Sequence, residues 1–267
     1  MLLFWLMRLL SGAAPRVAGR VAVLLTLRTR KRPGRRPPGA LADRFLVPGS
    51  GEVVVHRLGA NTGPRVLLVH GWNGSANDWH AVAQALVAAG FSVTVLDLPA
   101  HGASPGRTSS LPRFVRGVRE ADRRHGPFDV WVAHSMGAAA VLAVLATGSR
   151  ARRVILLSGV ADPTGALRAF ASGFGLSTAG TRAYLDGIER SEKMSLADLD
   201  GVRNAGLVTA PILVVHDRED RVVPIEEGRK LAQAMPSAQL LQTDGLGHRR
   251  ILSDATIVQS VVAFAKG

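Results

Sequence analysis

Short apolar runs rich in β-branched residues alternate with helix-like stretches from about Asp43 to the C-terminus. Continuous apolar runs of this length are typical of strands buried on both faces, and helices between such strands produce a parallel sheet covered on both sides. The pattern therefore predicts an α/β domain with a doubly wound, mostly parallel sheet over residues 43–267. The predicted strands are 52–57, 65–70, 91–96, 128–133, 152–157, 211–216 and 238–242, and the predicted helices are 77–89, 111–125, 136–147, 225–235 and 254–265.

Residues 161–207 interrupt this alternation. The segment is long, has no strong strand pattern and separates two predicted strands. In a doubly wound sheet, a long insertion of this kind is often a cap over the ligand site. We therefore expect a short cap insertion at about residues 161–207.

The first 42 residues differ from the rest of the chain and are predicted to form a basic amphipathic tail and a linker. Residues 1–40 hold nine of the 33 basic residues and none of the 20 acidic ones, so most of the formal net charge of +13 belongs to this segment. The remaining residues are close to electrically balanced, and we expect no nucleic-acid partner. The Pro- and Gly-rich stretch at 33–40 is typical of a linker.

Two apolar stretches in the tail are interrupted by Arg8, Pro15, Arg16 and Arg20, whereas a membrane-spanning helix needs about 20 mainly apolar residues. An amphipathic helix followed by a run of basic residues favours contact of residues 1–36 with an anionic membrane surface. Packing of the tail on its own domain is the alternative. We expect a cytoplasmic protein, peripheral on the inner face of the membrane, and favour this over a single N-terminal membrane anchor.

The chain contains no cysteine. This excludes disulfides, thiolate metal sites, iron–sulfur clusters and a cysteine nucleophile. The histidines do not show the helical spacing of a zinc site. We therefore expect neither a metal nor a cofactor.

Two serines compete for the role of nucleophile. Ser104 lies in a Gly-x-Ser-x-Gly sequence, but it follows its strand at a distance, and the next residue, Pro105, has no backbone N–H for an oxyanion hole. Ser135 directly follows a predicted strand and precedes a run of small, helix-forming residues. Since a nucleophile elbow needs a strand–turn–helix arrangement, Ser135 is the predicted nucleophile.

A serine nucleophile needs a histidine base and an acid that orients the base. Asp220 follows the predicted strand 211–216, and His248 follows the next strand in a Gly-flanked turn. Asp217 and Glu219 are neighbouring carboxylates, and Asp162 is a further candidate for the acid. We favour Asp220 because it lies just before the helix that begins near Pro224.

With these segments in this order, the chain from about Asp43 to Gly267 resembles the α/β-hydrolase fold superfamily, whose triad order is Ser, Asp, His. The resemblance implies that Ser135 attacks an acyl carbon, His248 acts as general base and acid, and Asp220 orients His248. It also implies an oxyanion hole formed by the backbone N–H groups of Trp72 and Met136. Ala133 departs from the family pattern, because it stands where the elbow usually has glycine.

The remaining site residues are predicted to line the substrate pocket. They are His70, Gly71, His134, Phe170 and Phe174. The resemblance implies a serine hydrolase that cleaves the ester or thioester of a small, lipid-like acyl substrate. A carbon–carbon bond hydrolase, an aminopeptidase and a non-catalytic membrane-associated binding protein stay as alternatives.

Overall fold

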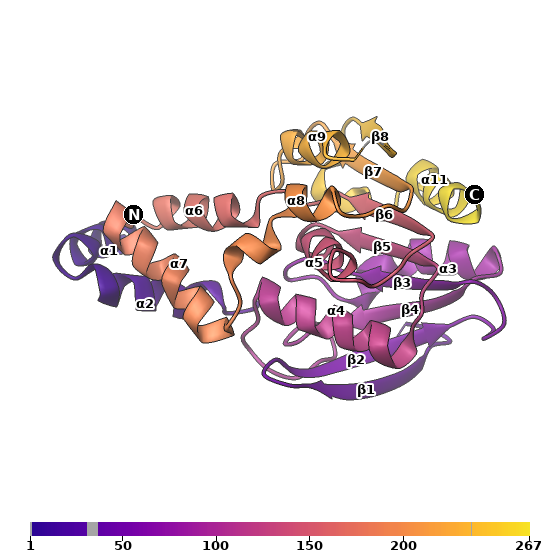
Figure 1. Ribbon diagram of the computed structural model, residues 1–267, viewed down its shortest axis with the longest axis horizontal. Coiled ribbons are helices and arrows are strands. Elements are labelled where there is room, and N and C mark those ends of the chain that lie inside the picture. The colour runs from indigo at the N-terminus through magenta and orange to yellow at the C-terminus, as the bar shows by residue number, and fades with distance from the viewer. Residues whose placement is uncertain (1, 31–36, 236) are drawn as a thin grey trace.

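The computed structural model describes residues 2–30, 37–235 and 237–267. Eight strands form one sheet in the order β1-β2-β4-β3-β5-β6-β7-β8 (Figure 1). β2 runs antiparallel to β1 and β4, and all other neighbours are parallel, so the predicted doubly wound, mostly parallel sheet is confirmed. The strands are β1 (Leu41–Val47), β2 (Gly51–Leu58), β3 (Arg65–Val69), β4 (Ser92–Asp97), β5 (Val130–His134), β6 (Arg153–Leu157), β7 (Ile212–Asp217) and β8 (Ala238–Thr243).

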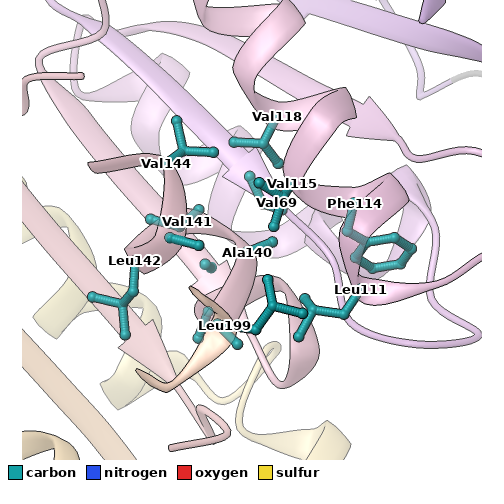
Figure 2. Close-up of a cluster of buried hydrophobic side chains, with 14 of the residues drawn as sticks. Val69, Leu111, Phe114, Val115, Val118, Ala140, Val141, Leu142, Val144 and Leu199 are labelled. Atoms are coloured by element: carbon teal, nitrogen blue, oxygen red, sulfur yellow. The ribbon is translucent and has the colours of Figure 1, made fainter. Parts of the chain in front are cut away.

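Helices cover both faces of this sheet. Successive side chains of a strand point to opposite faces, and in β3 Leu67 packs in one apolar cluster while Leu68 packs in the other. α3 (His80–Ala88) and α11 (Ala255–Lys266) complete the Leu68 cluster. On the opposite face, α4 (Leu111–His125), α5 (Met136–Leu145) and α9 (Ile225–Gln233) complete the Leu67 cluster. Figure 2 shows the side chains of α4 and α5 meeting in this second layer.

β1 is a strand that the hydrophobic pattern does not predict. Only Phe45 and Val47 of its seven residues are buried, because β1 lies at the edge of the sheet and pairs with β2 alone. An edge strand with one mostly solvated face shows no continuous apolar run. The other seven strands agree with the predicted ones to within about two residues.

The predicted cap insertion consists of helices and contains no strand. It comprises α6 (Pro163–Gly173), α7 (Thr178–Glu192), the 3₁₀ helix η2 (Leu196–Leu199) and α8 (Gly201–Ala205). The last residue of α7, Glu192, is buried and binds two arginines of α4: Arg113 Nε donates to its carboxylate at 2.9 Å, and Arg116 donates to the second oxygen. This buried ion pair fixes the end of the cap to the main domain.

The N-terminal arm, which we define as residues 2–30, packs against the cap. It contains α1 (Leu2–Ala13) and α2 (Pro15–Thr26), which lie beside α7 at one end of the molecule (Figure 1). The backbones approach so closely that a Cβ atom on Gly19 would lie 2.8 Å from the carbonyl carbon of Ala183. Tyr184 Oη also donates to Thr26 Oγ1 at 3.0 Å. Within the described segments, no helix combines the length and the apolar character that crossing a membrane requires.

Candidate active site

Ser135 occupies a strained turn between β5 and α5. Its φ of 55° and ψ of −125° lie in a region that L-residues rarely adopt. The turn fits because its neighbours are small: Ala133 is fully buried, and a Cβ on Gly137 would lie 2.5 Å from the carbonyl oxygen of His70. The sequence therefore forms a sharp strand-to-helix bend with the serine at its apex, although Ala133 replaces glycine.

The loop after β3 lies directly on Ser135. A Cβ added to Gly71 would be 2.6 Å from the Cβ of Ser135, and Trp72 is the next residue. Met136 is the first residue of α5, so its N–H belongs to the helix terminus, where backbone donors lack intrahelical acceptors. The structure thus places the loop that carries Trp72 against Ser135, with Met136 directly after it in the chain, and the oxyanion hole formed by their N–H groups stays a prediction.

His70 stabilises this loop through hydrogen bonds of its ring. Its Nδ1 donates to the Gly71 carbonyl at 2.7 Å, and its Nε2 accepts from the backbone N–H of Leu98 at 3.0 Å. Burial lowers the pKa of His70, which agrees with a neutral ring that uses one nitrogen as a donor and the other as an acceptor. The sequence analysis placed His70 among the pocket residues, but both of its ring nitrogens are bonded within the protein.

Ser104 has a structural role. It is fully buried, its hydroxyl donates to the Asp97 carbonyl, and it accepts from the backbone N–H of Val54 at 2.8 Å. Asp97 in turn binds His56 and the backbone N–H groups at Ala76 and Ala103. The Gly-x-Ser-x-Gly match therefore belongs to a brace between β2, β4 and the loop that follows β4.

Asp220 and His248 are brought together from the turns that follow β7 and β8, two neighbouring parallel strands. His248 Nδ1 donates to Asp220 Oδ2 at 2.8 Å, while Oδ1 of Asp220 accepts the backbone N–H groups of Val222 and Val223, both at 2.9 Å. Burial alone would raise the pKa of Asp220, but these three hydrogen bonds outweigh it and lower the pKa to about 2. Asp220 is therefore ionised at neutral pH, and it fixes the Nδ1–H tautomer of His248.

His248 lies against the residue that precedes Ser135. The rings of His134 and His248 are 4.6 Å apart, and His134 Nε2 donates to the His248 carbonyl at 2.8 Å. No hydrogen bond joins His248 to Ser135 in the part of the chain that the structure describes. Catalytic hydrogen bonds are often long or misaligned without a substrate. Proton transfer between these two side chains therefore requires this hydrogen bond to form when substrate binds.

His134 gives the protein a specific acid sensitivity. Burial, followed by the nearby His248, lowers the pKa of His134 from 6.5 to about 3. Between these values the unfolded chain binds a proton that the folded chain does not, so stability falls as the pH decreases from 6.5 toward 3, by at most about 1.4 kcal/mol per pH unit from this residue. Urea denaturation at pH 7, 6, 5 and 4 should show a shallower decline for His134→Gln than for the unsubstituted chain. An equal change in the exposed control His80→Gln, or no change in His134→Gln, would contradict this role.

Asp217 supports the His248 turn, a role that the sequence analysis did not predict. Its carboxylate accepts from Thr243 Oγ1 at 2.7 Å and from the backbone N–H of Leu246 at 3.0 Å. It therefore connects the end of β7 to the turn that carries His248. The only sequence signal for this contact was the position of a carboxylate at the end of a predicted strand.

The other predicted site residues lie elsewhere. Asp162 is the N-cap of α6, where its side chain accepts from the backbone N–H of Gly165. Phe170 and Phe174 stack on each other at 5.3 Å in the cap, and Phe170 also meets Tyr184. No contact in the described residues joins either phenylalanine to Ser135, so their role in substrate binding stays a prediction.

Ser135 itself is almost closed off, with 7% of its surface exposed. A cavity of about 1850 Å³ lies between α2, α6 and α7, and its lining does not include Ser135 or His248. In the described segments, no three histidine or acidic side chains lie together as metal ligands would.

Comparison with known proteins identifies the family of this chain. Residues 64–180 match the family described as alpha/beta hydrolase fold, and residues 193–266 match the family described as TAP-like protein. The chain belongs to the α/β-hydrolase fold superfamily. A comparison with curated proteins gives no match.

Solved α/β-hydrolase structures resemble the chain over most of its length. An esterase from Pyrococcus furiosus aligns with a TM-score of 0.67 at 17% identity and covers 90% of this chain and 98% of its own. A bromoperoxidase from Bacillus anthracis aligns at 0.65 and 18% identity over 85% and 100% of the two chains. A membrane phospholipase A, described as a bacterial virulence factor, aligns at 0.64 and 16% identity over 96% and 90%. At these identities the likeness shows the fold alone.

Proposed function

We propose that the protein is a serine hydrolase that cleaves a carboxylic ester or thioester through an acyl-enzyme on Ser135. The observation that carries this proposal is the 2.8 Å hydrogen bond from His248 Nδ1 to Asp220, in a structure that holds Ser135 at a strained elbow. Because Nδ1 carries the proton, Nε2 of His248 is left as the acceptor for the serine proton. All three side chains come from the carboxyl ends of parallel strands or the turns after them, where open α/β sheets bind ligands.

The reaction then follows from these positions. Ser135 Oγ attacks the acyl carbon while His248 takes its proton, and the negative charge that develops on the acyl oxygen meets the N–H groups of Trp72 and Met136. The imidazolium formed on His248 faces the ionised Asp220, which stabilises its charge. His248 next protonates the departing alcohol or thiol. Water then attacks the acyl carbon as His248 takes its proton, and His248 returns this proton to Ser135 Oγ as the acid leaves.

A lipid-like acyl substrate fits this proposal best. The cap provides the stacked pair Phe170 and Phe174 beside Tyr184, a suitable apolar surface for an acyl chain. The similar structures include esterases and a protein described as a membrane phospholipase A, although they share less than 20% identity with this chain.

Activity-based labelling tests the proposal directly. A fluorophosphonate reacts only with an activated serine, so the wild-type chain is expected to be labelled at one site and Ser135→Ala is expected to be unlabelled. p-Nitrophenyl esters of graded acyl length then report the preferred chain, with faster turnover expected for medium or long chains than for acetate. A folded protein that neither reacts with the probe nor turns over any ester would contradict the hydrolase assignment.

A further inference from the structure

The side of α1 that faces away from the protein is apolar. Leu3, Trp5, Leu6 and Leu9 are between 53% and 72% exposed, whereas Met7 of the same helix is 3% exposed. Residues three and four apart share one face of a helix, so these exposed side chains form a continuous stripe. A helix on the surface of a water-soluble domain normally carries polar residues there.

Exposed apolar side chains concentrate in the N-terminal arm. Single exposed leucines are common on proteins, but a contiguous group marks an interaction surface. Seven of the thirteen exposed large hydrophobic side chains in the described residues lie within this arm. Besides the four in α1, they are Val17, Leu24 and Leu25 of α2.

Positive charge accompanies this apolar surface. Residues 1–42 contain no aspartate or glutamate, so the arm carries only basic charged side chains. The guanidinium of Arg8 lies 5.8 Å from the centre of the Trp5 ring, which places a cation beside the exposed aromatic residue. The exposed arginines of the arm are Arg8, Arg16, Arg20, Arg28 and Arg30.

We propose that the N-terminal arm docks the protein on an anionic phospholipid bilayer, with the exposed stripe of α1 at the boundary between headgroups and acyl chains. Amphipathic helices with leucine and tryptophan on one face and arginine at its borders bind such surfaces. Anionic headgroups complement a segment that carries only positive charge. A second copy of the chain fits less well, because it would bring two strongly basic arms together.

The arm is also bonded to the loops around Ser135. Arg30 donates its backbone N–H to Asn73 Oδ1 at 2.8 Å, directly after the predicted oxyanion-hole residue, and Thr29 bonds to the backbone of Ala100 and Arg107. α2, which spans about 18 Å at 1.5 Å per residue, connects these contacts to α1. The arm therefore connects the proposed docking surface on α1 to the loops around Ser135. The docking proposal itself does not depend on catalysis.

Vesicle flotation of the full chain tests this inference, with Ser135→Ala used so that hydrolysis cannot alter the lipids. We expect binding to vesicles of phosphatidylcholine with 30 mol% phosphatidylglycerol, and at least tenfold weaker binding to phosphatidylcholine alone. Binding should also weaken as the salt concentration rises, because salt screens the attraction of the arginines.

Two pairs of variants separate the apolar and the charged contributions. Leu6→Asp with Leu9→Asp is expected to lower the partition coefficient at least tenfold, whereas Leu207→Asp, at an equally exposed leucine on the loop after α8, should leave it within about twofold. Arg8→Gln with Arg28→Gln should lower binding by about fivefold for each arginine. The control pair Arg57→Gln with Arg152→Gln, at two exposed arginines outside the arm, should not lower binding in this way. Circular dichroism confirms that each variant is folded.

Absence of binding to the anionic vesicles by the folded chain would overturn the inference. Equal binding by the Leu6→Asp, Leu9→Asp variant would overturn it as well. Light scattering gives a third outcome: a dimer that the two aspartates convert to a monomer, without vesicle binding, would show that this face joins two copies. Fluorophosphonate labelling is read separately, so a failure of docking and a failure of the proposed hydrolase activity give different results.

Discussion

Ser135→Ala and His248→Ala are each expected to lower kcat on an ester substrate about 10⁶-fold, and the double variant is expected to lose no more than either one. The two side chains perform one step, in which the hydroxyl loses its proton to the imidazole as it attacks. Removing either partner abolishes that step, so the second removal has nothing left to affect. The remaining rate should come from the N–H groups of Trp72 and Met136 and from substrate binding.

Steady-state kinetics of the four proteins on the preferred p-nitrophenyl ester give this comparison. His80→Ala is a matched control, since His80 is an exposed histidine at the start of α3, and its kcat should stay within about twofold of the wild-type value. If the losses in the single variants multiplied in the double variant, Ser135 and His248 would act in separate steps. A fall of less than about tenfold in either variant would contradict the proposed roles.

The order and type of most elements could be predicted from the sequence because they depend on local patterns. The strands of the central sheet are buried on both faces, and so they appear as continuous apolar runs. The choice of Ser135 over Ser104 followed from local chemistry as well, because Pro105 lacks an N–H. In the structure, Ser104 is hydrogen-bonded in the buried brace between β2 and β4. The role of Ser135 as nucleophile stays a prediction.

These local patterns do not predict contacts between segments that are far apart in the sequence. The exposed edge strand β1 has too few buried residues to show a run, and nothing in its sequence identifies β2 as its partner. The sequence indicated an amphipathic helix in the tail but left open whether it packs on the domain. The structure shows that α2 packs on the domain, and Gly19 permits this because only a residue without a side chain allows the close contact with Ala183.

The support around the candidate triad was also hidden from the sequence. His134 was predicted to pack at the elbow or to line the site, but the sequence did not show that its ring faces His248 and that its Nε2 donates to the backbone of that residue. In the sequence, Asp217 was a neighbouring carboxylate and a competing candidate for the acid. In the structure, it accepts a hydrogen bond from the turn before His248. The two aspartates therefore have different partners: Asp217 bonds the turn before His248, and Asp220 bonds the imidazole itself.

Asp220→Asn is expected to lower kcat about 10⁴-fold while the fold stays intact. The asparagine oxygen can still accept the N–H groups of Val222 and Val223, so the turn should survive. The amide nitrogen, however, would donate to Nδ1 of His248 and move the ring proton to Nε2, where the serine proton must go. The amide would also leave the imidazolium without the carboxylate whose pKa of about 2 keeps it charged throughout the working pH range.

Asp162→Asn is the matched comparison, because Asp162 was the other candidate acid and the structure makes it the N-cap of α6. Asparagine caps helices about as well as aspartate, so this variant should keep its kcat within about twofold and its melting temperature nearly unchanged. Kinetics of both variants from pH 5 to pH 9 complete the test. A large loss for Asp162→Asn combined with a small one for Asp220→Asn would transfer the role of the acid to the cap, and it would require a rearrangement that carries α6 toward His248.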